Sequence, residues 1–191
     1  MNSHLHRALR AQRLRAQETS GSSLIEVLVA VAVTMVGFLA FGRSMTESLQ
    51  LGEQNRQIGL ATAAAQRAVE ELYAADFAQV FALYNAEPSD DPDGSGTGPG
   101  AQFVAEGLVG ANGADALGTI SFPVAANAPG ELREDLNLAK FQPFDVDLDG
   151  VTDANDHSAD YQVLPVRVQI QWMDGRAQRE LTVETILGRK Q

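Results

Sequence analysis

The chain has 191 residues, with 14 Lys and Arg against 25 Asp and Glu, a formal net charge of −11 and no cysteine. This length allows one domain plus a membrane segment, and the lack of cysteine excludes a disulfide framework, a thiol nucleophile and thiolate metal ligation. The acidic balance also argues against nucleic acid as a partner, because its capture requires clustered Lys and Arg.

Positive charge is concentrated at the start of the chain. Residues 1–21 contain four arginines and one glutamate, a balance of +3, which leaves −14 on the remainder. Basic segments tend to stay on the cytoplasmic side of a membrane. We therefore expect a cytoplasmic N-terminus and an acidic body on the other side.

Residues 22–42 form an apolar stretch in which Glu26 is the only charged residue. A stretch of this length can span a membrane as a helix, which needs about 20 apolar residues. A carboxylate at membrane depth costs roughly 2.5–3.5 kcal/mol, so Glu26 is by default a functional residue that requires a partner. A secretory signal peptide and a simple anchor are the alternatives. The apolar run is too long for an ordinary signal peptide and Glu26 would penalise its insertion, whereas a simple anchor gives no reason for Glu26 or for the Gly-Ser-Ser step before the run.

The ten residues from Gly21 to Ala30 (GSSLIEVLVA) resemble the processing signal of type IV pilins and type II secretion pseudopilins. The resemblance implies that a prepilin peptidase cleaves between Gly21 and Ser22, removes leader 1–21 and methylates the new amino terminus. It also implies that Glu26, then the fifth residue, pairs with the N-terminal amine of a neighbouring subunit; a buried charge is tolerable when an opposite charge meets it.

Two features depart from the family pattern. Ser22 stands where the commonest subclass has phenylalanine, and the proline that many pilins carry in this helix is missing, since the first proline is Pro88. The missing proline predicts a straighter N-terminal helix.

The apolar stretch continues into an amphipathic segment. Apolar residues recur there at spacings of three and four: Ile58, Ala61, Ala65, Val69 and Leu72. This period predicts one helix from about residue 23 to about residue 79, roughly 85 Å long at 1.5 Å per residue. The alternative is two helices broken near Gly52 or Gly59, because an interior glycine costs about 1 kcal/mol relative to alanine.

The remainder of the chain is predicted to form a small extracytoplasmic domain. The predicted segments are leader 1–21, membrane and filament half 22–42, amphipathic half 43–80, and domain 81–191. Within that domain, residues 87–100 are all Gly, Pro, Ser, Thr or acidic, a composition typical of a flexible loop. Its Asp91-Pro92-Asp93-Gly94 run is similar to part of a calcium loop but lacks the other ligands.

Strand patterns follow the loop. Ile120, Phe122 and Val124 alternate around Pro123, which favours an edge strand. Residues 163–187 predict a hairpin with alternating apolar residues and a two-residue turn at Asp174-Gly175. That turn pairs Met173 with Arg176, Val168 with Leu181 and Val166 with Val183. The predicted fold class is α+β and pilin-like, with one long helix packed on a small antiparallel sheet.

Residues 145–156 have the spacing D-x-D-x-D-G-x-x-D-x-x-D. Calcium takes six to eight oxygens, which an EF-hand-type loop supplies from positions 1, 3, 5, 9 and 12 and from the carbonyl at position 7. Those positions are Asp145, Asp147, Asp149, Asp153, Asp156 and the carbonyl of Val151. Aspartate at position 12 resembles dockerin-like loops. The sequence predicts Ca²⁺ as a cofactor that orders this connection; the alternative is a solvated acidic turn.

Catalytic patterns are weak. His4 and His6 lie in the leader, and His157 with Asp160 is interpreted as a surface pair. The sequence has no phosphate-binding glycine loop and no zinc-ligand spacing, so we do not expect an enzyme. An exported enzyme would instead require cleavage after the apolar run.

The final hairpin is more loosely similar to the ends of V-type minor pilins and I-type minor pseudopilins. Together the resemblances imply a minor pilin or pseudopilin whose partners are other pilin or pseudopilin subunits, the prepilin peptidase, the inner-membrane assembly platform and the membrane. The implied location is the inner membrane with a single pass, then a pilus or pseudopilus in the periplasm or at the cell surface. The alternative is a monomeric, membrane-tethered calcium-binding domain.

Overall fold

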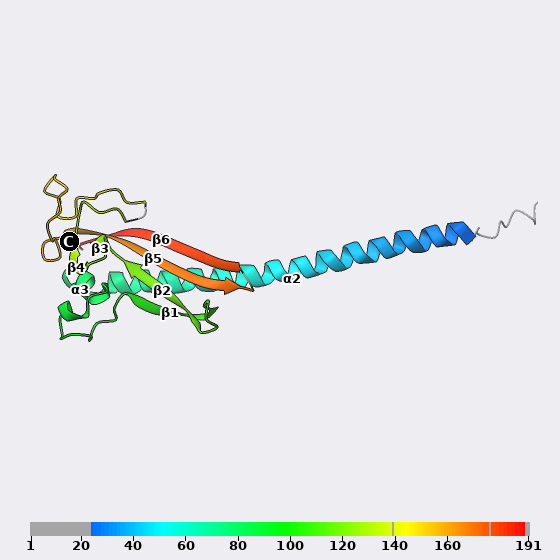
Figure 1. Ribbon diagram of the computed structural model, residues 1–191, viewed down its shortest axis with the longest axis horizontal. Coiled ribbons are helices and arrows are strands. Elements are labelled where there is room, and N and C mark those ends of the chain that lie inside the picture. The colour runs from blue at the N-terminus through cyan, green and yellow to red at the C-terminus, as the bar shows by residue number, and fades with distance from the viewer. Residues whose placement is uncertain (1–23, 139, 176, 190–191) are drawn as a thin grey trace, which may run out of the picture. The chain divides into compact units, whose positions relative to one another are not determined.

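The computed structural model describes residues 24–138, 140–175 and 177–189 (Figure 1). It confirms the α+β class, because a long apolar N-terminal helix packs on a small antiparallel sheet. The helical elements are α2 (Leu24–Ala74), η1 (Phe77–Gln79), α3 (Val80–Tyr84) and η2 (Pro88–Asp90). The strands are β1 (Gln102–Val109), β2 (Asp115–Ser121), β3 (Val124–Ala125), β4 (Ala128–Leu132), β5 (Val163–Asp174) and β6 (Ala177–Gly188).

The N-terminal part of α2 is apolar and exposed. Every residue from Leu24 to Leu51 is exposed, including large side chains such as Phe38, which is 74% exposed. Among the described residues, α2 is the one helix long and apolar enough to cross a membrane, judged by length and composition. An apolar surface of this kind requires lipid or other protein to cover it.

Helix α2 is continuous through Gly52 and Gly59, so the alternative of two helices is wrong. It ends at Ala74, before the predicted end near residue 79. Asp76 has an extended backbone conformation, and its carboxylate accepts a hydrogen bond from the N–H of Ala78 at 3.2 Å. This N-cap starts the short turn η1, so the chain leaves the axis of α2.

The C-terminal part of α2 packs along the sheet (Figure 1). Its buried residues are Ala61, Ala65, Ala68 and Leu72, whereas Ile58 of the predicted face is 50% exposed. The alanines let the helix backbone approach the sheet closely. Trp172 of β5 also donates a hydrogen bond from Nε1 to Oε1 of Gln57, at 3.1 Å.

The main sheet is antiparallel with the order β1-β2-β5-β6, and β3 and β4 form a separate pair. The predicted edge strand around Pro123 is wrong. Ile120 belongs to β2, which lies between β1 and β5, and Val124 begins β3. Proline cannot donate to a strand ladder, so β2 ends before Pro123 and the chain turns away.

The predicted C-terminal hairpin forms from β5 and β6, but its register differs by two residues. Val168 pairs with Val183, Val166 with Thr185 and Met173 with Gln178, in place of Leu181, Val183 and Arg176 respectively. Gly175 has φ +61° and immediately follows the last paired residue of β5, Asp174. Because side chains alternate with a period of two, this displacement leaves the apolar residues on the predicted face.

The core lies between the C-terminal part of α2 and the inner face of the sheet. Its fully buried members include Leu72, Leu108, Leu164, Val166, Val168 and Ile170. At one end of this core, the hydroxyl of Tyr161 donates a hydrogen bond to the carbonyl of Phe77. This bond ties the start of η1 to the segment that follows residues 145–156, called the acidic loop from here on.

Residues 87–100 follow a path held by hydrogen bonds. The N–H of Gly96 donates to the carbonyl of Pro88 at 2.9 Å, and that of Gly100 donates to the carbonyl of Leu83 at 2.9 Å. The carboxylate of Asp91 accepts a hydrogen bond from the N–H of Gly98 at 3.0 Å. Flexibility of this loop stays a prediction.

Candidate functional site

The residues predicted for processing and assembly lie at the start of the chain. Gly21 and Ser22 are outside the described residues. Glu26 lies in the first turn of α2, where the helix dipole favours a negative charge. Its neighbours Ile25 and Val27 are 68% and 50% exposed. The structure thus places this carboxylate within an exposed apolar helical surface.

Three of the predicted calcium ligands converge in the acidic loop. Asp145, Asp147 and Asp149 each offer a carboxylate oxygen, and these oxygens all lie within 4.8 Å of one another. The loop bends sharply here, because Leu148 and Gly150 have φ values of +61° and +92°. The sequence pattern therefore correctly brings the first three acids together.

Each of these aspartates also bonds to the loop backbone. Asp145 Oδ2 accepts from the N–H of Gly150 at 2.8 Å, and Asp147 Oδ1 accepts from the N–H of Asp149 at 3.0 Å. Asp149 Oδ1 accepts from the N–H of Val151 at 2.7 Å, and the Val151 side chain is exposed. These bonds fix the carboxylates and turn them toward the same region.

The second carboxylate oxygen of Asp145 could take a cation as its partner. Asp145 Oδ1 is buried and has no hydrogen-bond partner among the described residues. A buried carboxylate oxygen without a partner is unfavourable by the desolvation penalty of the group. The hydrogen bond from the N–H of Asp149 lowers the pKa of Asp147, but burial and the charges of Asp149 and Glu134 together raise it by more, so the net shift is upward. Negative charge is therefore crowded here, and the three carboxylates suit a hard cation that prefers oxygen ligands.

The last two predicted ligands have other partners. Asp153 accepts a hydrogen bond from the N–H of Asn155 at 2.7 Å and lies 3.2 Å from Nε2 of His157. Asp156 Oδ1 accepts hydrogen bonds from the N–H groups of Leu132 and Ser158, at 3.1 and 3.0 Å. These residues tie the end of the loop to the domain and do not join the group formed by the first three acids.

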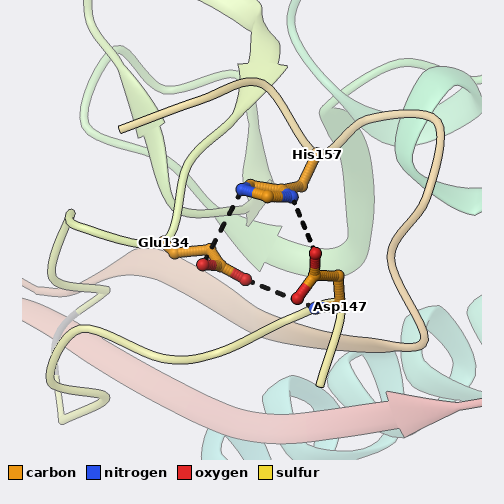
Figure 2. A group of neighbouring side chains, drawn as sticks. All are labelled: Glu134, Asp147 and His157. Atoms are coloured by element: carbon orange, nitrogen blue, oxygen red, sulfur yellow. Dashed lines mark hydrogen bonds and ion pairs between the residues drawn. The ribbon is translucent and has the colours of Figure 1, made fainter. Parts of the chain in front are cut away.

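A second group, which the sequence did not predict, adjoins the loop. His157 is 6% exposed, and its ring lies between the carboxylates of Glu134 and Asp147 (Figure 2). Nε2 is 3.7 Å from Glu134 Oε2, and Nδ1 is 3.5 Å from Asp147 Oδ2. Nδ1 also lies 3.2 Å from Asp160. The interpretation of His157 as a surface residue is therefore wrong, because the histidine is buried among carboxylates.

This surrounding favours a charged imidazole. Burial lowers the pKa of His157, but the hydrogen bond to Asp153 and the charges of Glu134, Asp160 and Asp147 raise it by more, so the net shift is upward. A protonated ring donates from both nitrogens, and carboxylates stand on both sides of this one. His157 thus places a basic ring among these carboxylates, and they favour its protonated form. The donor set of Glu134, Asp147 and His157 could also hold a metal ion.

Sequence signals for this second group are unequal. Asp153 and Asp160 flank His157 at spacings of four and three, which is visible locally. Glu134 has no such signal, because it precedes the loop and reaches it only through the path of the chain.

Comparison with protein-family models, with curated proteins and with solved structures finds no match for this chain. The helix and the loop residues therefore carry the functional assignment.

Proposed function

We propose that the chain is a minor pilin-like subunit, either a minor pilin or a pseudopilin, that assembles into a type IV pilus or type II secretion pseudopilus. The observation that carries the proposal is Glu26. It is the only charged residue between Ser22 and Gly42, and it lies on an exposed apolar helix that continues into an α+β domain. The role is structural, in filament initiation, at the tip or in cargo contact, and involves no reaction.

The proposed sequence of events combines the charge distribution of the chain with what the resemblance of residues 21–30 to prepilin signals implies. The basic leader stays cytoplasmic and the domain is exported, so that α2 spans the inner membrane once. A prepilin peptidase removes residues 1–21 and methylates Ser22. The subunit then leaves the membrane through the assembly platform and packs α2 against other subunits. In the filament, the carboxylate of Glu26 pairs with the N-terminal amine of a neighbour, because an unpaired charge in an apolar helix bundle is unfavourable.

Two measurements test assembly. Mass spectrometry of the chain purified from its native membrane should find Ser22, methylated, as the first residue, and Gly21→Val should leave Met1 or the full leader in place. Glu26→Ala should abolish recovery of the chain in the sheared or cross-linked filament fraction. Glu47→Ala is the matched control, since Glu47 lies on the same helix beyond the apolar stretch and its loss should leave recovery unchanged.

The outcomes separate the proposal from its alternative. An unprocessed chain that never copurifies with pilin-like subunits would support a monomeric membrane tether. Normal incorporation of Glu26→Ala into filaments would contradict the proposal directly.

We also propose that the acidic loop binds Ca²⁺. Asp145, Asp147 and Asp149 would hold the ion, with the buried Oδ1 of Asp145 as the oxygen that lacks another partner. When bound, calcium would neutralise the crowded carboxylates and link the loop together, stabilising the folded state by mass action.

A melting experiment tests the calcium proposal. At a free calcium concentration 100 times Kd, ligand linkage contributes about 2.7 kcal/mol, which raises Tm by roughly 9–12 °C for a domain of this size. Asp147→Asn should remove most of that shift. Asp93→Asn, in the loop of residues 87–100, is the control and should retain the Tm shift. Equal melting in calcium and in chelator would refute the calcium site.

A further inference from the structure

Glu134 is a buried carboxylate that bonds to the acidic loop from outside it. It follows β4 in the chain, and only 1% of its surface is exposed. Oε1 accepts hydrogen bonds from the N–H groups of Val146 and Asp147, at 2.6 and 3.3 Å. Oε2 accepts from the N–H of Asp153 at 3.2 Å. One side chain thus satisfies three backbone donors of the loop.

The positions of these donors explain what the carboxylate does. Val146 and Asp147 precede the sharp bend at Gly150, and Asp153 follows it. Glu134 therefore joins the two arms of the loop across the bend. Nε2 of His157 lies 3.7 Å from Oε2 of Glu134, so the ring packs beside this carboxylate (Figure 2).

We propose that Glu134 is a positioning residue that closes the acidic loop before any cation binds. The proposal rests on the calcium site proposed above, and it changes the role of the ion. Calcium then enters a loop that is already shaped, in contrast to the sequence-based expectation that calcium orders this connection. Glu134 accepts hydrogen bonds from the N–H of Asp147 and from the N–H of Val146, the residue that follows Asp145. These two bonds orient the ligands Asp145 and Asp147 before calcium binds.

The expected effect on affinity follows from outer-shell groups in metal sites. Residues that orient ligands without touching the metal typically change affinity by about 10–100-fold when replaced. In Glu134→Gln the side chain keeps its size, but its NH₂ group cannot accept a hydrogen bond from the N–H of Asp153. The variant side chain also carries no negative charge beside His157. We expect Ca²⁺ to bind Glu134→Gln at least about tenfold more weakly than the wild type.

The test uses the full chain in detergent micelles with chelator present. Amide hydrogen exchange followed by NMR should show protected N–H groups at Val146, Asp147 and Asp153 without calcium. Glu134→Gln should lose protection at the amide of Asp153, because the NH₂ group of glutamine cannot accept its hydrogen bond, whereas the remaining carbonyl oxygen can still accept from Val146 and Asp147. Protection in β5 should be retained, which a general loss of stability would not produce. Glu131→Gln is the control, since Glu131 is an exposed residue of β4 and should change neither protection nor calcium affinity.

Each result is decisive. Exchange of these three amides at the rate of unstructured chain in the calcium-free wild type would overturn the inference, as would unchanged protection and affinity in Glu134→Gln. If Glu134→Gln fails to fold, the wild-type measurement in chelator decides the question alone. If the wild type binds no calcium, the calcium proposal fails, but an Asp153 amide that is protected in the wild type and exchanges in Glu134→Gln still supports the role of Glu134 in closing the loop.

Discussion

Gly118 and Phe103 form a cross-strand pair in which the glycine makes room for an aromatic ring. They are directly opposite in β2 and β1. A Cβ on Gly118 would lie 2.5 Å from Cε1 and Cε2 of Phe103, and closer still to Cζ. Phe103 is packed against the core, so its ring cannot leave this place without exposing apolar surface. We therefore expect Gly118→Ala to destabilise the domain.

The expected loss of stability in Gly118→Ala is estimated from two quantities of similar size, the cost of overpacking and the cost of exposing the Phe103 ring. Overpacking a core typically costs about 1–3 kcal/mol, and moving a phenylalanine ring into water costs about 1.5–3 kcal/mol when it was fully buried. Because Phe103 is partly buried, we expect the free energy of unfolding to fall by about 2 kcal/mol. In a Phe103→Ala background the new methyl group meets no ring, and alanine is favoured over glycine within a strand by about 0.5–1 kcal/mol. The coupling energy between the two sites is then about 2–3 kcal/mol.

Urea unfolding of the full chain in detergent micelles measures this cycle. The fluorescence of Trp172, the single tryptophan of the chain, reports on the packing of the sheet against α2. Gly188→Ala is the control, because no atom lies within 4 Å of the added Cβ, and its effect should stay within about 0.5 kcal/mol. Equal destabilisation by Gly118→Ala with and without Phe103 would refute the reasoning.

Two further substitutions test the helix contact and the buried histidine. Trp172→Phe removes the hydrogen bond to Gln57 and should lower the free energy of unfolding by about 1–2 kcal/mol, measured by circular dichroism; no change would mean that this bond does not hold the sheet to α2. His157→Gln removes the basic ring beside the buried Glu134 and, at a pH where the ring is protonated, should cost about 2 kcal/mol in chelator. This is less than the 3–5 kcal/mol of a fully buried pair, because Asp153 and Asp160 reach solvent. A stable His157→Gln variant would show that Glu134 does not need the charge.

Local patterns in the sequence predict much of this fold. The period of three and four along α2 and the alternation in β5 and β6 are properties of single elements, and the structure confirms both. The convergence of Asp145, Asp147 and Asp149 is also local, since Gly150 permits the bend between near neighbours. Glu26 stands out because it is a charged residue in an apolar stretch, which composition alone reveals.

Contacts between distant segments were decided only by the tertiary structure. The hairpin register depends on which residue occupies the left-handed turn position, and a shift of two leaves the apolar pattern unchanged. The pairing of Phe103 with Gly118 requires β1, for which the sequence pattern gave no signal. Glu134 meets His157 and the loop because β4 and the following segment bring the chain back across the loop. Sequence periodicity reports which side of an element is buried, but burial alone does not determine which distant residue a buried charge will meet.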